Sequence, residues 1–225
     1  MLEVLRQTFE QKLQTLQTEV LLLGDMVDTA LGAAVESLTR QDLASAGRLV
    51  ADNCFITQKR LAIEAEILSQ IATQQPVAGD LRLLVAALEI AAELERMGSY
   101  AASIAQTTLS QAHQPLPEPF LSTLPAMGQK AREMLRQSLL ALARRDIMIA
   151  RAIPKQDDEV DRLYQEAHQA LVVLLKTDTQ GAGQATALSR VAHNLERTAD
   201  RVLNICEWVI FAITGEMKEL NGSAR

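Results

Sequence analysis

The sequence predicts an all-α protein made of two tandem three-helix bundles. Of its 225 residues 48% are hydrophobic but only 3% are aromatic. The core must therefore consist mainly of aliphatic side chains, whereas sheets usually contain more aromatic and β-branched residues. Many of the six prolines and ten glycines lie between long helix-forming tracts, which is typical of helices joined by short breaks. The second half of the chain also repeats the first.

Three helices are expected in the first half. Apolar positions recur at helical spacing over residues 2–39, which predicts a long first helix. Asp42 can cap a second helix, reaching about Thr73, because its carboxylate can accept a hydrogen bond from a free N–H of the first turn. Pro76 then suits the first turn of a third helix, since that N–H would be unpaired anyway. This helix extends to about Gln111.

A proline-rich stretch, residues 113–119, separates a predicted bundle over 1–112 from a second over 120–225. Proline cannot donate the helical hydrogen bond, so the stretch is predicted to be a linker.

Three helices are also expected in the second half. The first begins near Leu121 and stops at Arg144-Arg145. The second begins at Asp146 and continues to a break between Lys176 and Gly183, and the last ends near Gly215.

The two halves are duplicates of each other. A shift of 104 residues aligns Gly24 with Gly128 and Asp42 with Asp146. Beyond the second turn the shift falls to 101, as a loop shorter by three residues would produce, and it aligns Glu95 with Glu196. Each half is therefore predicted to be an up-down-up bundle with short connections. The alternative is a single irregular six-helix bundle.

Four carboxylates in the second half are predicted to converge. Glu196 and Asp200 are four residues apart on the last helix, and Asp157 and Asp161 have the same spacing on the preceding one. Folding these helices about a turn near Gln180 places the two pairs at similar heights. Their mutual repulsion would raise pKa values or require cations.

Those cations could be supplied by a metal or by arginines. An oxygen-only donor set suits Mg²⁺, Ca²⁺ or Mn²⁺, and carboxylate clusters on bundles also hold iron and other transition ions. In the structural alternative, the acids flank the apolar stripe and pair with Arg197 or Arg201, which the helical periodicity places outermost. His193 is a candidate fifth ligand, although a histidine there is more often a surface or core residue.

The first half retains one carboxylate at the matching positions, which are Asn53, Thr57, Glu95 and Ser99. Any metal site there is therefore predicted to be lost.

Composition argues against several classes of partner and location. The net charge is −6, without a basic run, so we expect no nucleic-acid partner. The apolar segment from Trp208 to Gly215 is far shorter than the roughly 20 residues that span a bilayer, and the N-terminus has no signal-peptide pattern. Cys54 and Cys206 fit no zinc spacing, and we expect both to pack as small hydrophobes in a reducing cytoplasm. Trp208 is expected to serve packing.

Almost the whole chain resembles the PhoU family of phosphate-uptake regulators. The segments that carry the resemblance are IATQQPVAGDLRLLVAALEIAAELERMGSYAASIA in the first half, and MGQKAREML, DDEVDRL and AHNLERTADRVLNICEWV in the second. The resemblance implies two bundles related by pseudo-symmetry. It also implies E/DxxxD metal motifs, which Asp157–Asp161 and Glu196–Asp200 match and Asn53–Thr57 and Glu95–Ser99 do not. Tyr100 departs from the family's usual histidine.

The resemblance further implies a function. PhoU-like proteins are not known as enzymes; they damp phosphate-starvation signalling by bridging the phosphate ABC transporter, through its ATPase, and a membrane sensor histidine kinase. A homodimer that reaches the membrane only through these partners is expected, with at most one metal ion (iron, Mg, Mn or Zn) in the second bundle.

Two alternatives come from other classes of protein. A carboxylate-bridged di-iron oxidase needs Glu-x-x-His pairs, yet none of His113, His168 and His193 lies three residues after a glutamate. The other alternative is a helical scaffold without a role in phosphate signalling, whose acids form salt bridges or bind a metal.

Overall fold

Helices account for almost all of the described chain. The computed structural model describes residues 2–112, 114–177, 182–217 and 219–220, and this part contains helices and no strand. The helices are α1 (Leu2–Arg40), α2 (Leu43–Gln74), α3 (Ala78–Ser110), α4 (Phe120–Arg144), α5 (Ile147–Ala152), α6 (Pro154–Thr177) and α7 (Ala182–Thr214). The all-α prediction is confirmed. None of the helices in these ranges is long and apolar enough to cross a membrane.

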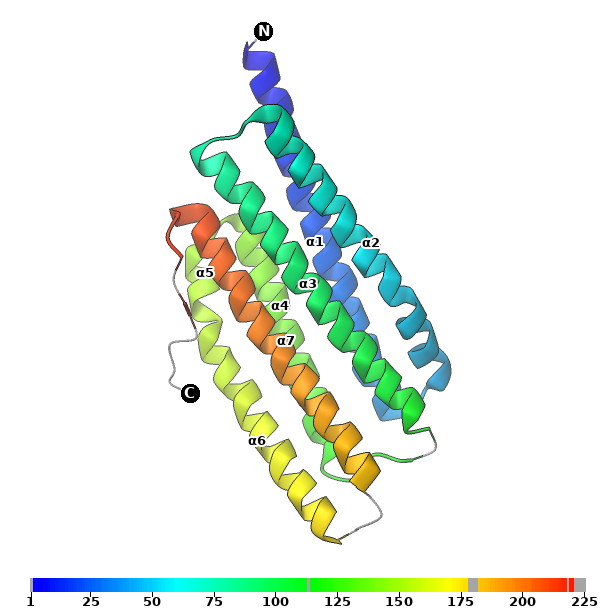
Figure 1. The fold of residues 1–225 in the computed structure, drawn as a ribbon. Helices are drawn as coiled ribbons and strands as arrows, with labels where there is room; N and C mark the ends of the chain where they lie inside the picture. Colours follow the sequence, from blue (N-terminus) through cyan, green and yellow to red (C-terminus); the bar gives the residue numbers. More distant parts are fainter. Residues whose placement is uncertain (1, 113, 178–181, 218, 221–225) are drawn as a thin grey trace.

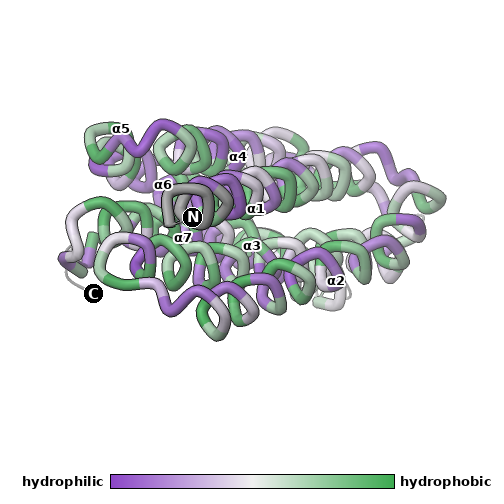
Figure 2. The backbone as a smooth tube through the Cα atoms, turned by 90° about the horizontal axis from the view of Figure 1, so that it is seen from above, coloured by the Kyte–Doolittle hydropathy of each residue, from purple (hydrophilic) through white to green (hydrophobic). Residues whose placement is uncertain are grey.

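The six long helices run alongside one another, with α2 at one edge, α6 at the other, and α1, α3, α4 and α7 between them (Figure 1). The first three helices form one bundle and the last four form the other. The two bundles meet where α3 packs on α7 and α1 on α4. Hydrophobic and hydrophilic segments alternate along the helices (Figure 2), as expected for amphipathic helices. The two bundles share one continuous apolar core.

The first two turns of the second half copy those of the first. Asp42 caps α2 by accepting a hydrogen bond from the Ser45 N–H at 3.0 Å, and Asp146 caps α5 through the Met148 N–H at 2.8 Å. The residues before the caps, Gln41 and Arg145, have φ angles of 55° and 52°. Both helix ends therefore use the left-handed conformation that commonly terminates a helix, which supports the 104-residue repeat.

Two predicted helix boundaries are wrong. The third helix begins at Ala78 rather than at Pro76. Pro76 lies in the connection, because Gln75 already ends α2 in a left-handed conformation and Val77 is extended. The single helix expected from Asp146 is divided into α5 and α6 at Ile153, since Pro154 has no N–H to donate to the preceding turn.

The remaining connections lie close to their predicted positions. α6 ends at Thr177 and α7 begins at Ala182, while residues 178–181 of the predicted break lie outside the described residues, as does His113. Within the proline-rich stretch, Leu116 is buried, and the Pro115 carbonyl accepts a hydrogen bond from Gln184 at 3.0 Å. The domain division at 113–119 stays a prediction.

The cysteines differ from each other. Cys206 is buried in the core, and this burial raises the pKa of its thiol. Cys54 is exposed, so the expectation that both cysteines pack as hydrophobes is wrong for Cys54, which lies on the outer side of α2. Trp208 packs partly buried against the core, with its ring 5.5 Å from that of Phe211.

Two equivalent glycines allow α1 and α4 to approach closely. A Cβ atom on Gly24 would lie 2.5 Å from Leu139 of α4, and one on Gly128 would lie 2.9 Å from Val35 of α1. Val35 and Leu139 are themselves equivalent under the 104-residue shift. The α1–α4 contact is therefore made twice, once by each half, as a pseudo-two-fold relation requires.

Substituting Gly128 by valine is expected to lower the free energy of unfolding by about 1–3 kcal/mol, because the added carbons overlap the stiff Val35 side chain. Chemical denaturation measures this loss. Gly47→Val in α2 is the control, since nothing lies within 4 Å of a Cβ atom there; its stability should change by less than about 0.5 kcal/mol. Equal losses in both variants would contradict the packing of α1 on α4.

Candidate functional site

The four predicted carboxylates form an acidic cluster on two neighbouring helices, with Asp157 and Asp161 on α6 and Glu196 and Asp200 on α7. Burial raises the pKa of Asp157 to about 7, and repulsion from Asp161, Asp200 and Glu196 adds to the effect. Asp157 therefore lies within electrostatic reach of the other three carboxylates, as the hairpin geometry predicted.

Glu196 brings a buried oxygen atom without a hydrogen bond, Oε2, to the acidic cluster. Burial, followed by repulsion from Asp200, raises the pKa of Glu196, while His193 and Arg197 oppose the shift. The His193 Nδ1 atom is 3.5 Å from Oε2, and its side chain is 57% exposed. A buried carboxylate oxygen without a donor favours either protonation or a cation.

Arg197 already compensates one of the acids. Its Nη1 atom lies 2.8 Å from Asp200 Oδ2, and Tyr100 of α3 lies beside the guanidinium. The structural alternative of an arginine pairing with the acids thus holds for Asp200.

In the described residues, no group of three or more His, Cys, Asp or Glu side chains is arranged to hold a metal ion. The chemistry of the acidic cluster nevertheless suits a hard cation, because its donors are oxygens, its charges repel one another, and one buried oxygen accepts no hydrogen bond. The metal site stays a prediction. His168, on α6, is exposed.

The equivalent positions in the first half form a less charged version of the same arrangement, with Glu95 as its single carboxylate. Thr57 donates a hydrogen bond to Glu95 Oε1 at 3.2 Å across α2 and α3, while Asn53 Oδ1 is buried without a partner. Ser99 is exposed on α3. With one carboxylate in place of four, this arrangement does not require a cation.

Arg201 does not occupy the outermost position that the periodicity predicted. Its Nη1 atom lies 3.2 Å from Glu93 Oε2 on α3, and the side chains of Arg201 and Glu93 are only 15% and 7% exposed. Glu93 also pairs with Arg96 at 2.9 Å. The prediction fails because α7 is covered on two sides, by its own bundle and by α3 of the other bundle.

The sequence carried a signal for this buried ion pair. Glu93 lies three residues after Ile90 and four before Met97, both completely buried, so it occupies an apolar-stripe position. A charge at such a position requires a buried partner. Asn194 of α7 also donates a hydrogen bond to the hydroxyl of Ser103 on α3 at 2.9 Å, so a second polar contact joins the two bundles.

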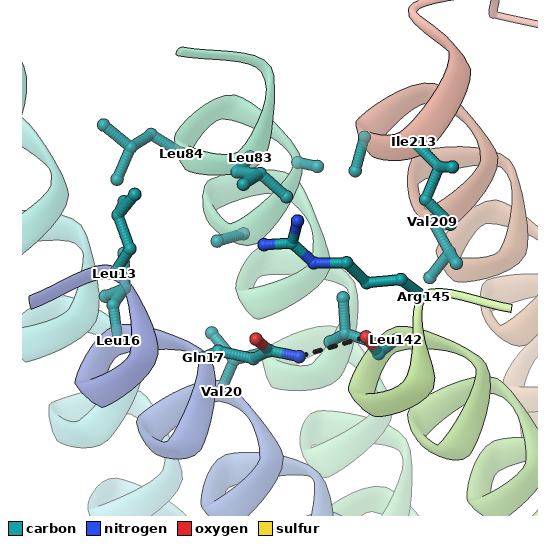
Figure 3. A pocket seen from close by; sticks show the side chains of 13 residues that line it. Leu13, Leu16, Gln17, Val20, Leu83, Leu84, Leu142, Arg145, Val209 and Ile213 are labelled. Atoms are coloured by element: carbon teal, nitrogen blue, oxygen red, sulfur yellow. Dashed lines mark hydrogen bonds between the residues drawn. The ribbon is translucent and has the colours of Figure 1, made fainter. Parts of the chain in front are cut away.

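An apolar pocket lies where α1, α3, α4 and α7 meet (Figure 3), and it shares no residue with the acidic cluster. Its lining is apolar except for Gln17 and Arg145. Gln17 donates a hydrogen bond to the Leu142 carbonyl at 3.0 Å, and the Arg145 side chain extends between Leu83 and Val209. The sequence did not predict this pocket, because its walls come from helices of both bundles.

The fold and the repeat define a class: duplicated proteins of two tandem three-helix bundles, here with an acidic cluster on the second bundle. The PhoU domain matches this chain twice, over residues 20–108 and 124–209, once in each half. The chain therefore belongs to the PhoU family, as the resemblance of its motifs predicted.

Individual relatives agree with this assignment. The chain is 33% identical over 211 residues to the phosphate-specific transport system accessory protein PhoU of Edwardsiella tarda, covering 92% of this chain and 85% of the relative. The crystal structure of PhoU from Pseudomonas aeruginosa superimposes with a TM-score of 0.87 at 26% identity, covering 92% and 100% of the two chains. The phosphate transport system regulatory protein PhoU from Streptococcus pneumoniae gives 0.86 at 28%, covering 93% and 99%.

Proposed function

We propose that this protein is an accessory protein of a phosphate-specific transport system and restrains phosphate uptake and the phosphate-starvation response when phosphate is plentiful. The observation that carries the proposal is the match of both halves to the PhoU domain, together with relatives that bear this name over more than nine-tenths of the chain.

In this role the protein acts as a cytoplasmic adaptor, and as a homodimer, between the ATPase of the phosphate ABC transporter and a sensor histidine kinase. Long amphipathic helices support such a role, because exposed helix faces and the grooves between them are common recognition surfaces for other proteins. Here α2 and α6 lie at the two edges of the molecule (Figure 1), where each can meet a different partner.

The acidic cluster on α6 and α7 gives the second bundle a further property. We infer that Asp157, Asp161, Glu196 and Asp200 bind one metal ion, with hard cations such as Mg²⁺ or Mn²⁺ or an iron ion as candidates. The ion would supply positive charge. The carboxylates would then remain ionised at neutral pH, and their two helices would be held together at this point. The first bundle, with Asn53 and Thr57, takes no ion.

Deleting the gene should derepress a phosphate-starvation promoter in phosphate-rich medium, and the wild-type gene supplied in trans should restore repression. A reporter fused to that promoter measures the response, and low-phosphate medium, where both strains should be equally active, is the control. Normal repression in the deletion strain would contradict the regulatory function. It would favour the alternative, a helical scaffold without a role in phosphate signalling.

A further inference from the structure

The first bundle has an open apolar groove between α1 and α2. Its volume is about 440 Å³. Leu22 and Phe55 on its rim are 47% and 54% exposed, and Met26 lies on the same side of α1. The floor is made by small residues, namely Ala30, Gly98, Ala101 and Ala102. Large exposed aromatic and aliphatic side chains around a hollow are typical of an interaction site.

The duplicated half provides an internal comparison for the floor of this groove. The positions equivalent to the four small residues hold Met134, Ala199, Val202 and Leu203, and all four of these side chains are buried. Larger side chains therefore fill in the second bundle the space that stays open in the first.

The rim positions also differ between the two bundles, because the second bundle has charged residues where the first has uncharged ones. Met26, Thr29 and Phe55 of the first bundle correspond to Lys130, Glu133 and Glu159 of the second. These charged residues are satisfied there, since Lys130 pairs with Glu133 at 3.8 Å and Glu159 with Arg162 at 2.6 Å. The same backbone thus carries a solvated charged surface in one half and an apolar groove in the other. The groove is a property of the side chains and not of the fold.

The charges beside the groove indicate the kind of partner. Asp25 and Asp52 line it from opposite helices, both are exposed, and neither has an ion-pair or hydrogen-bond partner within the described residues. Asn53 adds a buried Oδ1 acceptor without a donor. Free carboxylates attract Lys or Arg and repel acidic lipid head groups, so the groove suits a basic partner better than a membrane surface.

The length of the groove limits the partner segment. From Leu22 to Ala30 the groove follows α1 for about 12 Å, which is roughly two helical turns. An amphipathic helix with apolar side chains at positions i, i+3 or i+4, and i+7 spans this length. Phe55 offers a rigid aromatic surface and Met26 an adaptable one for such side chains.

We propose that this groove binds an amphipathic helix of another protein, with two or three apolar side chains on the bound face and Lys or Arg beside them. The proposal rests on the adaptor function proposed above, because it assigns one of the adaptor's partner-binding surfaces. The peptide experiment below can fail while phosphate regulation stands, and the reporter experiment can fail while the peptide binds, so the two failures are distinguishable.

The test uses the full chain and a fluorescent 16-residue helical peptide with leucines at i, i+4 and i+7 and lysines on both flanks, measured by fluorescence anisotropy. Wild-type protein is expected to bind it saturably. Phe55→Glu, which introduces the glutamate found at the equivalent position 159, should weaken binding at least about tenfold.

Leu68→Glu is the matched control, because Leu68 is also 54% exposed but lies about 20 Å farther along α2. This variant should change binding less than about twofold. Asp25→Asn/Asp52→Asn should weaken binding about threefold or more and reduce its salt dependence.

Several results would overturn the proposal. These are no saturable binding to the wild type, equal losses for Phe55→Glu and Leu68→Glu, or equal binding of a peptide with glutamates in place of the lysines. Two further measurements test other occupants. If the wild type binds vesicles of acidic lipid and Phe55→Glu does not, the groove is a membrane site and the proposal is overturned. If Phe55→Glu converts a dimer into a monomer in analytical ultracentrifugation, the groove is covered by a second copy of this chain.

Discussion

Replacing Glu93 by alanine is expected to lower the free energy of unfolding by about 3 kcal/mol. The substitution leaves the Arg201 guanidinium buried between α3 and α7 without its carboxylate partner, and the Arg201 Nε atom is already buried without a hydrogen bond. Removing one member of a buried ion pair costs more than the pair itself contributes, because the remaining charge is still desolvated. Urea denaturation followed by circular dichroism measures the loss.

Two variants separate this explanation from a general packing defect. Arg96→Ala removes the other partner of Glu93, but the Arg96 side chain is 55% exposed, so the loss should be below about 1 kcal/mol. The double variant Glu93→Leu/Arg201→Leu removes both buried charges and should recover most of the stability. If the double variant is no more stable than Glu93→Ala, the buried charge is not the cause.

Changing Asp157 to asparagine, the residue at equivalent position 53, is expected to stabilise the metal-free protein at pH 8 by about 2 kcal/mol. The pKa of Asp157 is raised in the folded state to about 7, whereas an unfolded aspartate titrates near about 3.9. The protonated carboxyl therefore favours folding below about pH 4, and this contribution is lost as the pH rises through 7. The full shift corresponds to about 4 kcal/mol, which solvent screening at this partly exposed site reduces to roughly half.

Thermal unfolding between pH 4 and pH 8 measures the difference between the two proteins. The stability difference should be close to zero at pH 4, increase as the pH rises, and remain constant above about pH 7.5. Asp158→Asn is the control, because Asp158 is an exposed neighbour and its removal should have less than about 0.5 kcal/mol of effect. Parallel stability curves for wild type and Asp157→Asn would show that the pKa of Asp157 is not raised in the folded protein.

The sequence predicted the helices well because their signals are local. The Asp42 cap and its copy at Asp146 follow from the chemistry of one helix end, and the repeat fixed the order of the elements. The errors arose where local signals compete. Pro76 can lie either in the first turn of α3 or in the connection before it. Pro154 separates α5 from α6, but the spacing of apolar residues is the same on both sides of it. Neither alternative can be decided from hydrophobic spacing alone.

The candidate site was predictable to the extent that one hairpin determines it. Spacing placed Asp157 and Asp161 beside Glu196 and Asp200, because residues equally far from a turn lie at equal heights. Arg201 was misplaced since its surroundings depend on how the two bundles pack, which one helix does not reveal. The groove beside Phe55 was missed because three of its four small floor residues lie on a third helix, α3, whose position relative to α1 and α2 cannot be read from the sequence of either helix.

We expect the two halves to keep one fold while only the second binds an ion. The most direct test is metal content by mass spectrometry, after the full chain has been purified without chelator, loaded with Mn²⁺ or Fe²⁺, and desalted. We expect one ion per chain, lost in Glu196→Ala/Asp200→Ala and retained in Glu95→Ala. A wild-type protein without metal under every loading condition, or the same content in all three proteins, would contradict it.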